Sequence, residues 1–144
     1  MIKVICVGKL KETYLVDACL EYLKRIGKYT HIELIELKDS NMICEKEEIL
    51  KHIKFKDYVI TLEILGNNIS SLVLANKIDK ILMINPNITF IIGGSDGLAD
   101  DIKKRSNYAL SFSQLTFPHQ LFRVMLLEQI YRCFKILSNE TYHK

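Results

Sequence analysis

The chain has 144 residues, of which 49% are hydrophobic and 26% are charged, with a formal net charge of +3. This composition is typical of a globular domain and excludes a disordered chain, and the length is sufficient for a hydrophobic core. The first residues lack the apolar segment and cleavage site of a signal peptide, and no apolar stretch approaches the roughly 20 residues that span a bilayer. We therefore expect a soluble cytoplasmic protein without a membrane contact.

Neither the cysteines nor the histidines form a pattern that predicts a metal site. There is no Cys-x-x-Cys pair among Cys6, Cys19, Cys44 and Cys133, and no histidine cluster completes a ligand set. Cys6 and Cys19 lie in apolar segments. We expect free thiols that act as small core residues, and no metal.

Basic residues are concentrated toward the C-terminus. Residues 103–144 hold seven Lys and Arg but only two acidic residues, Glu128 and Glu140. A basic region of this kind fits contact with a polyanion such as RNA. The same charges fit an ordinary solvated surface equally well, so this feature alone does not decide between the two.

The first part of the chain alternates apolar runs with amphipathic segments. Residues 1–7, 31–37 and 57–64 predict strands. Between them, residues 12–26 place their apolar side chains on one helical face, and residues 45–54 predict a short charged helix. The alternation of strand and helix indicates an α/β domain with a mostly parallel sheet and helices on both of its faces.

The same alternation continues through the middle of the chain. Gly66-Asn67-Asn68 predicts a turn. Ser70 or Ser71 can cap a helix that ends before Asn85-Pro86-Asn87, and residues 88–92 predict the most continuous buried strand. No linker or repeat interrupts the chain, which predicts a single domain over residues 1–144.

The last third is less regular. Residues 99–105 predict a short basic helix, residues 108–112 a fifth strand, and residues 113–118 a loop. Residues 119–137 predict a long helix, followed by a polar tail. That helix carries two apolar stripes, the first formed by Val124, Leu127, Tyr131, Phe134 and Leu137 and the second by Phe122, Leu126, Cys133 and Ile136.

A helix with two apolar stripes must bury two of its sides. One stripe can pack against the sheet, while the second requires another partner. A homodimer is the favoured explanation, because most soluble oligomers are symmetric homodimers. The alternative is that a neighbouring helix of the same chain covers the second stripe.

Ligands of open α/β sheets bind at the carboxyl ends of the strands. Three segments qualify here: the end of the strand at 59–62, the loop at 93–97 and the loop at 113–118. Gly93 and Gly94 remove side chains where a ligand would approach the backbone, although a tight strand-to-helix turn requires glycine equally. Neither Gly-x-Gly-x-x-Gly nor a Gly-Lys-Ser/Thr phosphate loop is present. A pyrophosphate ligand is therefore not expected, whereas an adenosyl ligand without phosphates stays possible.

A hydrolase is the rival interpretation of the glycine-rich turn, because Ser95 lies in it and Asp96, Asp100 and His119 are available. The segment lacks the Gly-x-Ser-x-Gly elbow, and Ser95 fits a turn or a helix cap better than a nucleophile. His119 begins the last helix, where it either bonds neighbouring backbone or contacts a ligand. On that helix, Glu128 and Arg132 fit either a surface ion pair or part of a polar strip that faces a substrate.

Several ordered motifs cover the C-terminal half of the chain. They are Ile-Gly-Gly-Ser-Asp-Gly-Leu (92–98), Arg-Ser-Asn-Tyr-Ala-Leu-Ser-Phe-Ser (105–113), Leu-Thr-Phe-Pro-His-Gln (115–120), Arg123, Glu-Gln-Ile-Tyr-Arg (128–132) and Tyr-His-Lys (142–144). This set closely resembles the 23S ribosomal RNA pseudouridine-N3 methyltransferase family of the SPOUT, or α/β-knot, class. Val-Gly-Lys-Leu-Lys-Glu (7–12) and Val-Ile-Thr-Leu-Glu (59–63) match the family's N-terminal half, so the resemblance covers nearly the whole chain.

The resemblance implies a SPOUT-like domain whose C-terminal part threads a trefoil knot, a rare exception to the rules of chain topology. It implies S-adenosylmethionine as the methyl donor and an obligate homodimer. The implied substrate is a pseudouridine in 23S rRNA, modified on the assembled ribosome. The expected partners are thus a second copy of the chain and the ribosome.

Carried over position by position, the resemblance implies a donor pocket of eight residues: Leu62, Gly93, Phe112, Ser113, Gln114, Leu115, Thr116 and Phe117. All lie at or beside the three strand-end segments selected above. Two places depart from the family: residues 38–46 are shorter than its usual segment, and Leu72 stands where an acidic residue is expected. Both lie outside the implied pocket, so they affect the expected surface contacts rather than the reaction.

The expected reaction is in-line attack of the base's N3 on the sulfonium methyl group, for which the protein mainly positions the reactants. Because an imide N–H must lose its proton, a general base or a stabilising cation would help. His143 is the candidate base, because histidine titrates nearest neutral pH, and Arg132 is the candidate for holding phosphate or developing negative charge. Tyr142 offers a ring that can stack on a nucleotide.

We expect the tail that carries Tyr142 and His143 to be unpacked until substrate binds. The alternative class for the whole protein is a non-catalytic RNA- or nucleotide-binding α/β protein. Transfer of a labelled methyl group to ribosomes separates the two classes.

Overall fold

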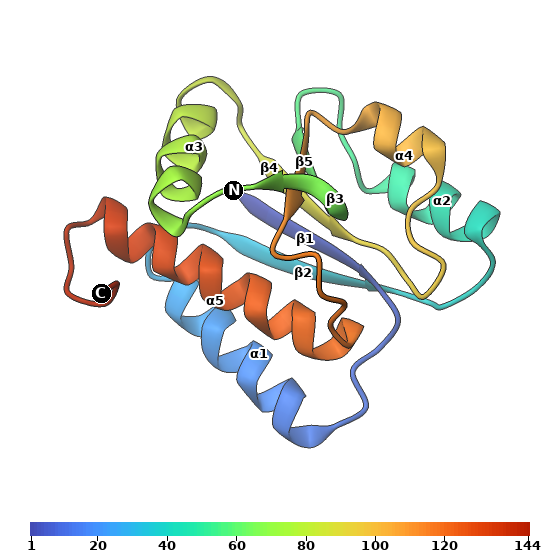
Figure 1. Cartoon of the computed structure of the whole chain (residues 1–144), viewed down its shortest axis with the longest axis horizontal. Helices are drawn as coiled ribbons and strands as arrows, with labels where there is room; N and C mark the ends of the chain where they lie inside the picture. Colours follow the sequence, from blue (N-terminus) through green and yellow to red (C-terminus); the bar gives the residue numbers. More distant parts are fainter.

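The computed structural model describes residues 1–144 as five strands and five helices (Figure 1). In chain order they are β1 (Ile2–Val7), α1 (Thr13–Ile26), β2 (Ile32–Leu37), α2 (Met42–Lys51), β3 (Tyr58–Asn68), α3 (Ser71–Ile84), β4 (Ile88–Ile92), α4 (Asp100–Arg105), β5 (Tyr108–Ser111) and α5 (His119–Leu137). The α/β class and the order of elements predicted from the sequence are confirmed. No helix combines the length and the apolar character needed to cross a membrane.

The five strands form one sheet in the order β2-β1-β4-β3-β5, and every neighbouring pair is parallel. All residues of β1 and β4 are buried, which explains why both strands are nearly continuous apolar runs. Along β1, Val4 and Cys6 pack in a cluster with α1, α3 and α5, whereas Ile5 and Val7 pack in a second cluster with α2 and α4. Helices therefore cover both faces of the sheet, as Figure 1 shows.

Two elements extend beyond their predicted limits. Gly66-Asn67-Asn68, expected to be a turn, instead continues β3 alongside β5 after a shift in register. A Cβ at Gly66 would lie 2.8 Å from the Ala109 carbonyl group, so glycine serves a close approach of two backbones here. α2 begins at Met42 rather than at residue 45, because the Asn41 side chain caps it by accepting the N–H of Cys44 at 2.9 Å.

The second apolar stripe of α5 is covered by the same chain. Leu126 and Cys133 are fully buried, and the Cys133 thiol lies 4.0 Å from the carbonyl oxygen of Ser71 at the start of α3. The Phe122 ring packs against Phe112 with its centroid 4.8 Å away. Since α5 packs between α1 and α3, the inference of a homodimer from this stripe is wrong (Figure 1). The homodimer itself stays a prediction.

Candidate functional site

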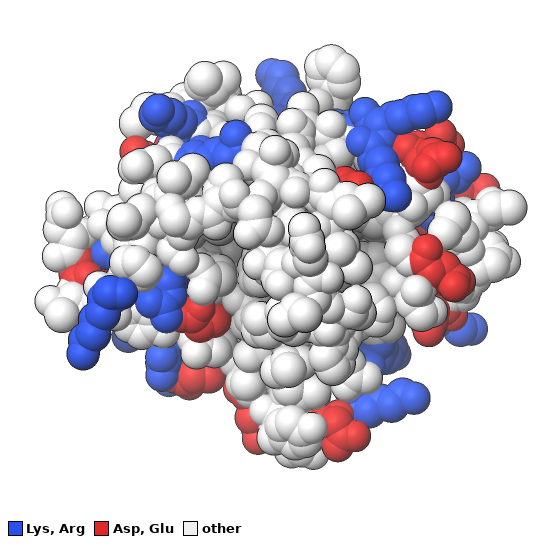
Figure 2. Space-filling model, viewed as in Figure 1, with Lys and Arg blue, Asp and Glu red and all other residues white.

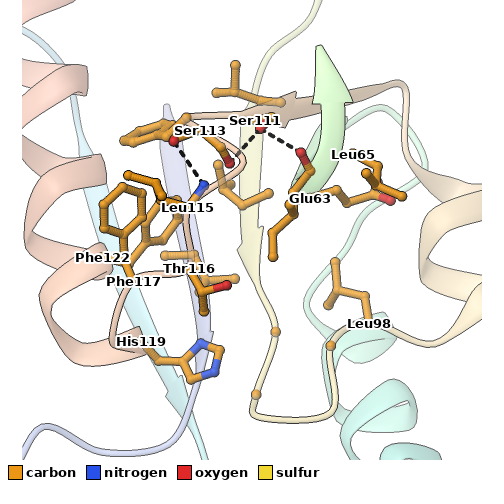
Figure 3. Close-up of a pocket in the computed structure, with 18 of the residues that line it drawn as sticks. Glu63, Leu65, Leu98, Ser111, Ser113, Leu115, Thr116, Phe117, His119 and Phe122 are labelled. Carbon is orange, nitrogen blue, oxygen red and sulfur yellow. Dashed lines mark hydrogen bonds between the residues drawn. The ribbon is translucent and has the colours of Figure 1, made fainter. Parts of the chain in front are cut away.

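A cavity of about 540 Å³ opens at the carboxyl edge of the sheet (Figure 3). Three segments form most of it: the middle of β3 at 62–65, the loop at 93–98 that follows β4, and the loop at 112–119 that leads from β5 into α5. They overlap the three segments that the sequence selected. The two loops follow the carboxyl ends of β4 and β5, which parallel strands direct to one edge, whereas β3 continues past the cavity to Asn68. Its volume lies in the range of small-molecule sites.

Seven of the eight residues expected to bind the donor line this cavity: Leu62, Gly93, Phe112, Ser113, Leu115, Thr116 and Phe117. Gln114 is the exception, because it is exposed and does not line the cavity. The prediction of the donor pocket omitted five polar lining residues, which are Glu63, Ser95, Lys103, Ser111 and His119. Glu63 was accessible to sequence reasoning as the neighbour of Leu62 at a predicted strand end. Lys103 belongs to α4, and only the fold brings it to the cavity.

The glycines at the end of β4 serve the loop itself. A Cβ at Gly93 would lie 2.9 Å from the backbone of Gly97, and Gly97 has a φ of +79°, which favours glycine. The N–H of Gly97 donates to the carbonyl oxygen of Gly94 at 3.0 Å, which closes a tight turn. The turn alone therefore explains Gly93, although the residue also borders the cavity.

Local hydrogen bonds and ring contacts hold the loop at 112–119. The Ser111 hydroxyl lies 2.8 Å from the carbonyl oxygen of Ile64, and the N–H of Leu115 donates to the Ser113 hydroxyl at 3.0 Å. The Phe117 ring stacks on Phe122 of α5, with an angle of 17° between the ring planes. Figure 3 shows this loop as one wall of the cavity, opposite Glu63 and Leu98. The wall is thus formed before any ligand binds.

Arg123 fixes the start of α5 relative to the sheet. Its side chain is buried, with Nη1 donating to Glu36 at 2.5 Å and Nη2 donating to the carbonyl oxygen of Gly8 at 3.0 Å. These partners lie at the carboxyl ends of β2 and β1. Arg123 was not among the predicted site residues, although its place on the same helical face as Leu127 and Ile130 indicates a buried arginine. We interpret it as a positioning residue for the cavity.

The cavity combines apolar walls with a few polar groups. Its aromatic and aliphatic side chains suit a flat heterocycle, and the loop backbone offers N–H and C=O groups to the edge of such a ring. The Glu63 carboxylate is oriented by the Thr61 hydroxyl, which donates to it at 2.6 Å. Ser95 and His119 both line the cavity, but no hydrogen bond joins them, so the hydrolase alternative gains no support.

The candidate catalytic residues form a second cluster at the far end of α5. Arg132 donates from Nε and Nη2 to one oxygen of Glu128, at 3.0 Å and 2.5 Å. The Tyr142 hydroxyl donates to the same oxygen at 3.1 Å, and the Arg132 guanidinium lies 4.8 Å from the centre of the Tyr142 ring. The expectation of an unpacked tail is therefore wrong, because Glu128 and Arg132 hold the tail in place.

The tail is also held by a second set of contacts. Glu140 accepts a hydrogen bond from the Tyr29 hydroxyl at 2.6 Å and another from Lys135 at 2.7 Å. Tyr29 follows α1, so Glu140 connects the tail to a distant part of the chain. These contacts place Tyr142 and His143 beside Arg132.

The cluster constrains the chemistry of its members. Burial raises the pKa of the Tyr142 hydroxyl to about 12, and the Glu128 carboxylate adds to this effect. Tyr142 therefore stays protonated at neutral pH and is no general base. Arg132 Nη1 lies 3.1 Å from Nδ1 of His143, and since arginine only donates, this nitrogen must accept. In this arrangement Arg132 occupies the free lone pair of the His143 ring, so His143 must leave Arg132 before it can take a proton.

The cavity and the tail cluster lie apart within one protomer. His119, at the cavity, and Arg132 are both on α5, and 13 residues of helix span about 20 Å. Figure 1 shows the C-terminus at the opposite end of α5 from the loop at 112–119. One protomer therefore does not bring the candidate catalytic residues to the candidate donor pocket.

The parallel sheet, with a cavity formed at its carboxyl edge by two loops and β3, corresponds to a known class of enzymes. Residues 1–143 match the family described as "Predicted SPOUT methyltransferase". The chain belongs to this family. Membership confirms that the chain is a methyltransferase, with S-adenosylmethionine as the donor predicted from the sequence.

Individual relatives extend this result to the full length of the chain. The chain is 49% identical over 154 residues to "Ribosomal RNA large subunit methyltransferase H" of Caldicellulosiruptor saccharolyticus, and all of both chains is covered. It is 50% identical over 157 residues to a protein of the same name from Clostridium perfringens, with 99% of each chain covered. The recognition of the family from the sequence is thereby confirmed.

Solved structures of distant relatives confirm the fold. A probable methylase family protein from Haemophilus influenzae Rd KW20 has a TM-score of 0.59 at 14% identity, covering 99% of this chain and 70% of that one. The SpoU methyltransferase AviRb from Streptomyces viridochromogenes, described in complex with AdoMet, has a TM-score of 0.51 at 8% identity. That match covers 94% of this chain and 60% of AviRb.

Proposed function

We propose that this methyltransferase transfers the methyl group of S-adenosylmethionine to N3 of a pseudouridine in 23S rRNA, on the assembled ribosome. Relatives about half identical over the whole chain are named as methyltransferases of the large-subunit rRNA, which supports the class of substrate. The observation that carries the proposal is the cavity itself, because segments far apart in the sequence enclose a single space at the carboxyl edge of the sheet.

The chemistry of the cavity fits the donor. Phe117, Leu62 and Leu115 supply apolar surface for the adenine ring, and the backbone at 112–117 can bind its polar edge. Glu63 offers a carboxylate to the ribose hydroxyls or to the cationic part of the ligand. When bound, the donor supplies a methyl group that is already activated by its positive sulfur. The residues of the cavity need only hold it in the orientation for in-line attack.

We propose a homodimer in which the tail of one protomer reaches the cavity of the other. The separation of about 20 Å along α5 motivates it, because both clusters are needed at one reaction centre. Around the cavity, the side chain of Leu65 is 94% exposed and that of Leu115 is 70% exposed. Figure 2 shows few charged side chains over the N-terminal half of α5 and the loop that precedes it, whereas charged side chains lie toward the other end of this helix. Such a surface favours contact with a second copy of the chain.

In this site the tail residues and Arg132 contact the target nucleotide of the RNA. Arg132 provides a permanent positive charge for a phosphate or for the anion that forms when N3 loses its proton. His143 accepts that proton after RNA displaces it from Arg132. Tyr142, protonated at neutral pH, contributes its ring and its hydroxyl donor.

Transfer of a labelled methyl group to intact ribosomes tests the proposal. Ribosomes that carry pseudouridine at the target position should accept the label, and ribosomes with uridine there should not. Methylation at N3 should also block reverse transcription, since N3 lies on the Watson–Crick edge. Binding of the protein to ribosomes without any methyl transfer would favour the non-catalytic alternative. Faster transfer to protein-free rRNA than to ribosomes would contradict the proposed substrate.

Mixing two inactive variants tests the shared site. One variant lacks residues 142–144, and the other, Thr116→Arg, fills the cavity. If each site combines two protomers, random mixing produces heterodimers with one intact site, and activity should recover to about one quarter of the wild-type value. No recovery of activity in a mixture shown to contain heterodimers would contradict a site shared between two protomers. His143→Ala should lower turnover more than donor affinity.

A further inference from the structure

Phe55 is the most exposed large apolar side chain of the protein, with 96% of its surface accessible. It lies in the turn between α2 and β3, at the amino edge of the sheet. In Figure 1 this turn is the green arch at the top of the view, beside the loop that joins α4 to β5. The cavity lies at the opposite, carboxyl edge. A single exposed apolar side chain is common on protein surfaces, so the residues around Phe55 decide what its exposure indicates.

The turn that carries Phe55 is held from two sides. Arg105, at the end of α4, places Nη2 within 3.1 Å, 3.3 Å and 3.0 Å of the carbonyl oxygens of Lys54, Phe55 and Asp57. From the interior, the Asp57 carboxylate accepts the N–H of Lys54 at 2.9 Å. The backbone is thus fixed with the Phe55 ring directed to solvent. Because the backbone of the turn is already ordered, binding of a partner to Phe55 orders only the side chain.

Two exposed lysines flank the ring. Lys54 and Lys56 form no ion pair, and the adjacent acid, Asp57, is buried and paired with Lys3 at 2.6 Å. The surface of the turn is therefore an aromatic face between two uncompensated positive charges. Single-stranded nucleic acid matches this pattern, because its bases stack on aromatic rings while its phosphates attract lysine. RNA carries a negative charge on every phosphate and therefore always matches the two lysines. A second copy of the chain offers no such regular negative charge.

We propose that the turn Lys54–Asp57 is a second RNA contact, in which Phe55 stacks on an unpaired base of rRNA and Lys54 and Lys56 bind the adjacent phosphates. This inference rests on the proposed function for the identity of the RNA. The contact lies away from the reaction centre, so it contributes to the binding of the large substrate and not to the chemical step. Through this contact the protein also binds RNA outside the target nucleotide.

Binding of deproteinised 23S rRNA and of a short single-stranded RNA oligonucleotide tests the contact. Phe55→Ala should weaken both and raise the KM for ribosomes about tenfold, whereas Phe55→Tyr, which keeps the ring face, should bind as the wild type does. The double variant Lys54→Gln/Lys56→Gln should lower the slope of log affinity against log salt by about 1.4 for single-stranded RNA. The kcat at saturating ribosomes, the donor affinity and the Tm should not change. Ile43→Ala, which removes another exposed apolar side chain, serves as the matched control.

The outcomes separate this contact from the alternatives. Unchanged RNA affinity in Phe55→Ala and in the lysine double variant would overturn the proposal. A higher KM for ribosomes with unchanged binding of both protein-free RNAs would identify a ribosomal protein as the partner and would also overturn it. If binding of RNA depends on Phe55 but no ribosome or rRNA accepts a methyl group, the RNA contact stands and the proposed function fails.

Discussion

Replacing Asp57 by asparagine should lower the free energy of unfolding by about 3–5 kcal/mol, the typical cost of removing one partner of a buried ion pair. The Asp57 side chain is fully buried, and Nζ of Lys3, which is also buried, lies 2.6 Å from its Oδ2. The carboxylate further accepts the Lys54 N–H and the Asn87 amide, each at 2.9 Å. In a domain of this size, each kcal/mol corresponds to about 3 °C, so the Tm should fall by about 9–15 °C.

The same contacts determine how stability depends on pH. Burial alone raises the pKa of Asp57, but hydrogen bonds from Lys3, the Lys54 N–H and Asn87, together with the charge of Lys3, lower it more, so the net pKa lies below the ordinary 3.8. The ionised carboxylate therefore stabilises the folded state fully above that ordinary value. This contribution is lost as the pH falls below it and through the folded-state pKa. Acid should thus destabilise the wild type more steeply than Asp57→Asn.

Thermal unfolding followed by circular dichroism measures these effects. Lys3→Met combined with Asp57→Asn should be more stable than Asp57→Asn alone, because the single variant leaves a buried charge without a partner. Glu48→Gln removes the exposed pair with Lys51 and should leave the Tm almost unchanged. A decrease of less than about 3 °C for Asp57→Asn would refute the reasoning, since it would mean that Lys3 finds another partner or reaches water.

Three further changes test the site. Deleting residues 142–144 should leave donor affinity in calorimetry unchanged and remove most methyl transfer at saturating donor; full turnover by the truncated protein would exclude the tail from the reaction. Gly93→Ala should lower the Tm even without donor, because the added Cβ would lie 2.9 Å from the Gly97 backbone. An unchanged Tm would show that the loop shifts to accommodate the Cβ without loss of stability. Leu65→Glu should give monomers in light scattering, while Ile84→Glu, exposed on α3, should not; a dimer that survives Leu65→Glu contradicts the proposed interface.

Sequence periodicity predicted most of the fold correctly, because burial imposes a regular pattern on each element. The buried runs of β1 and β4 and the amphipathic α1 follow directly from this constraint. Gly66-Asn67-Asn68 was misassigned, because its residue types favour a turn locally. The pairing of this segment with β5, and the close approach of Gly66 to Ala109, depend on residues that lie more than 40 positions away. The trefoil knot implied by the resemblance stays a prediction.

The candidate site was predictable in part. Gly93 and the loop at 112–117 follow the ends of β4 and β5, which a parallel sheet brings together, and Leu62 lies within the neighbouring β3. The sequence raised His119 as a candidate ligand contact, and it lines the cavity. Lys103 could not be assigned in the same way, because its position at the cavity depends on where α4 packs. Gln114 belongs to the predicted loop but is exposed and does not line the cavity, because the direction of a loop side chain depends on the backbone conformation of the loop.

The sequence by itself determined the fold class, the order of the elements and the family, because hydrophobic periodicity and ordered motifs are local properties of the chain. Only the tertiary structure decided which surfaces are covered. The second stripe of α5 is apolar whether α3 or another protomer covers it, and only the packing shows that α3 does. The tail is polar whether or not it is bound, and only the contacts of Tyr142 and Glu140 show that it is held. Such outcomes depend on contacts between distant segments, whose geometry no local pattern encodes.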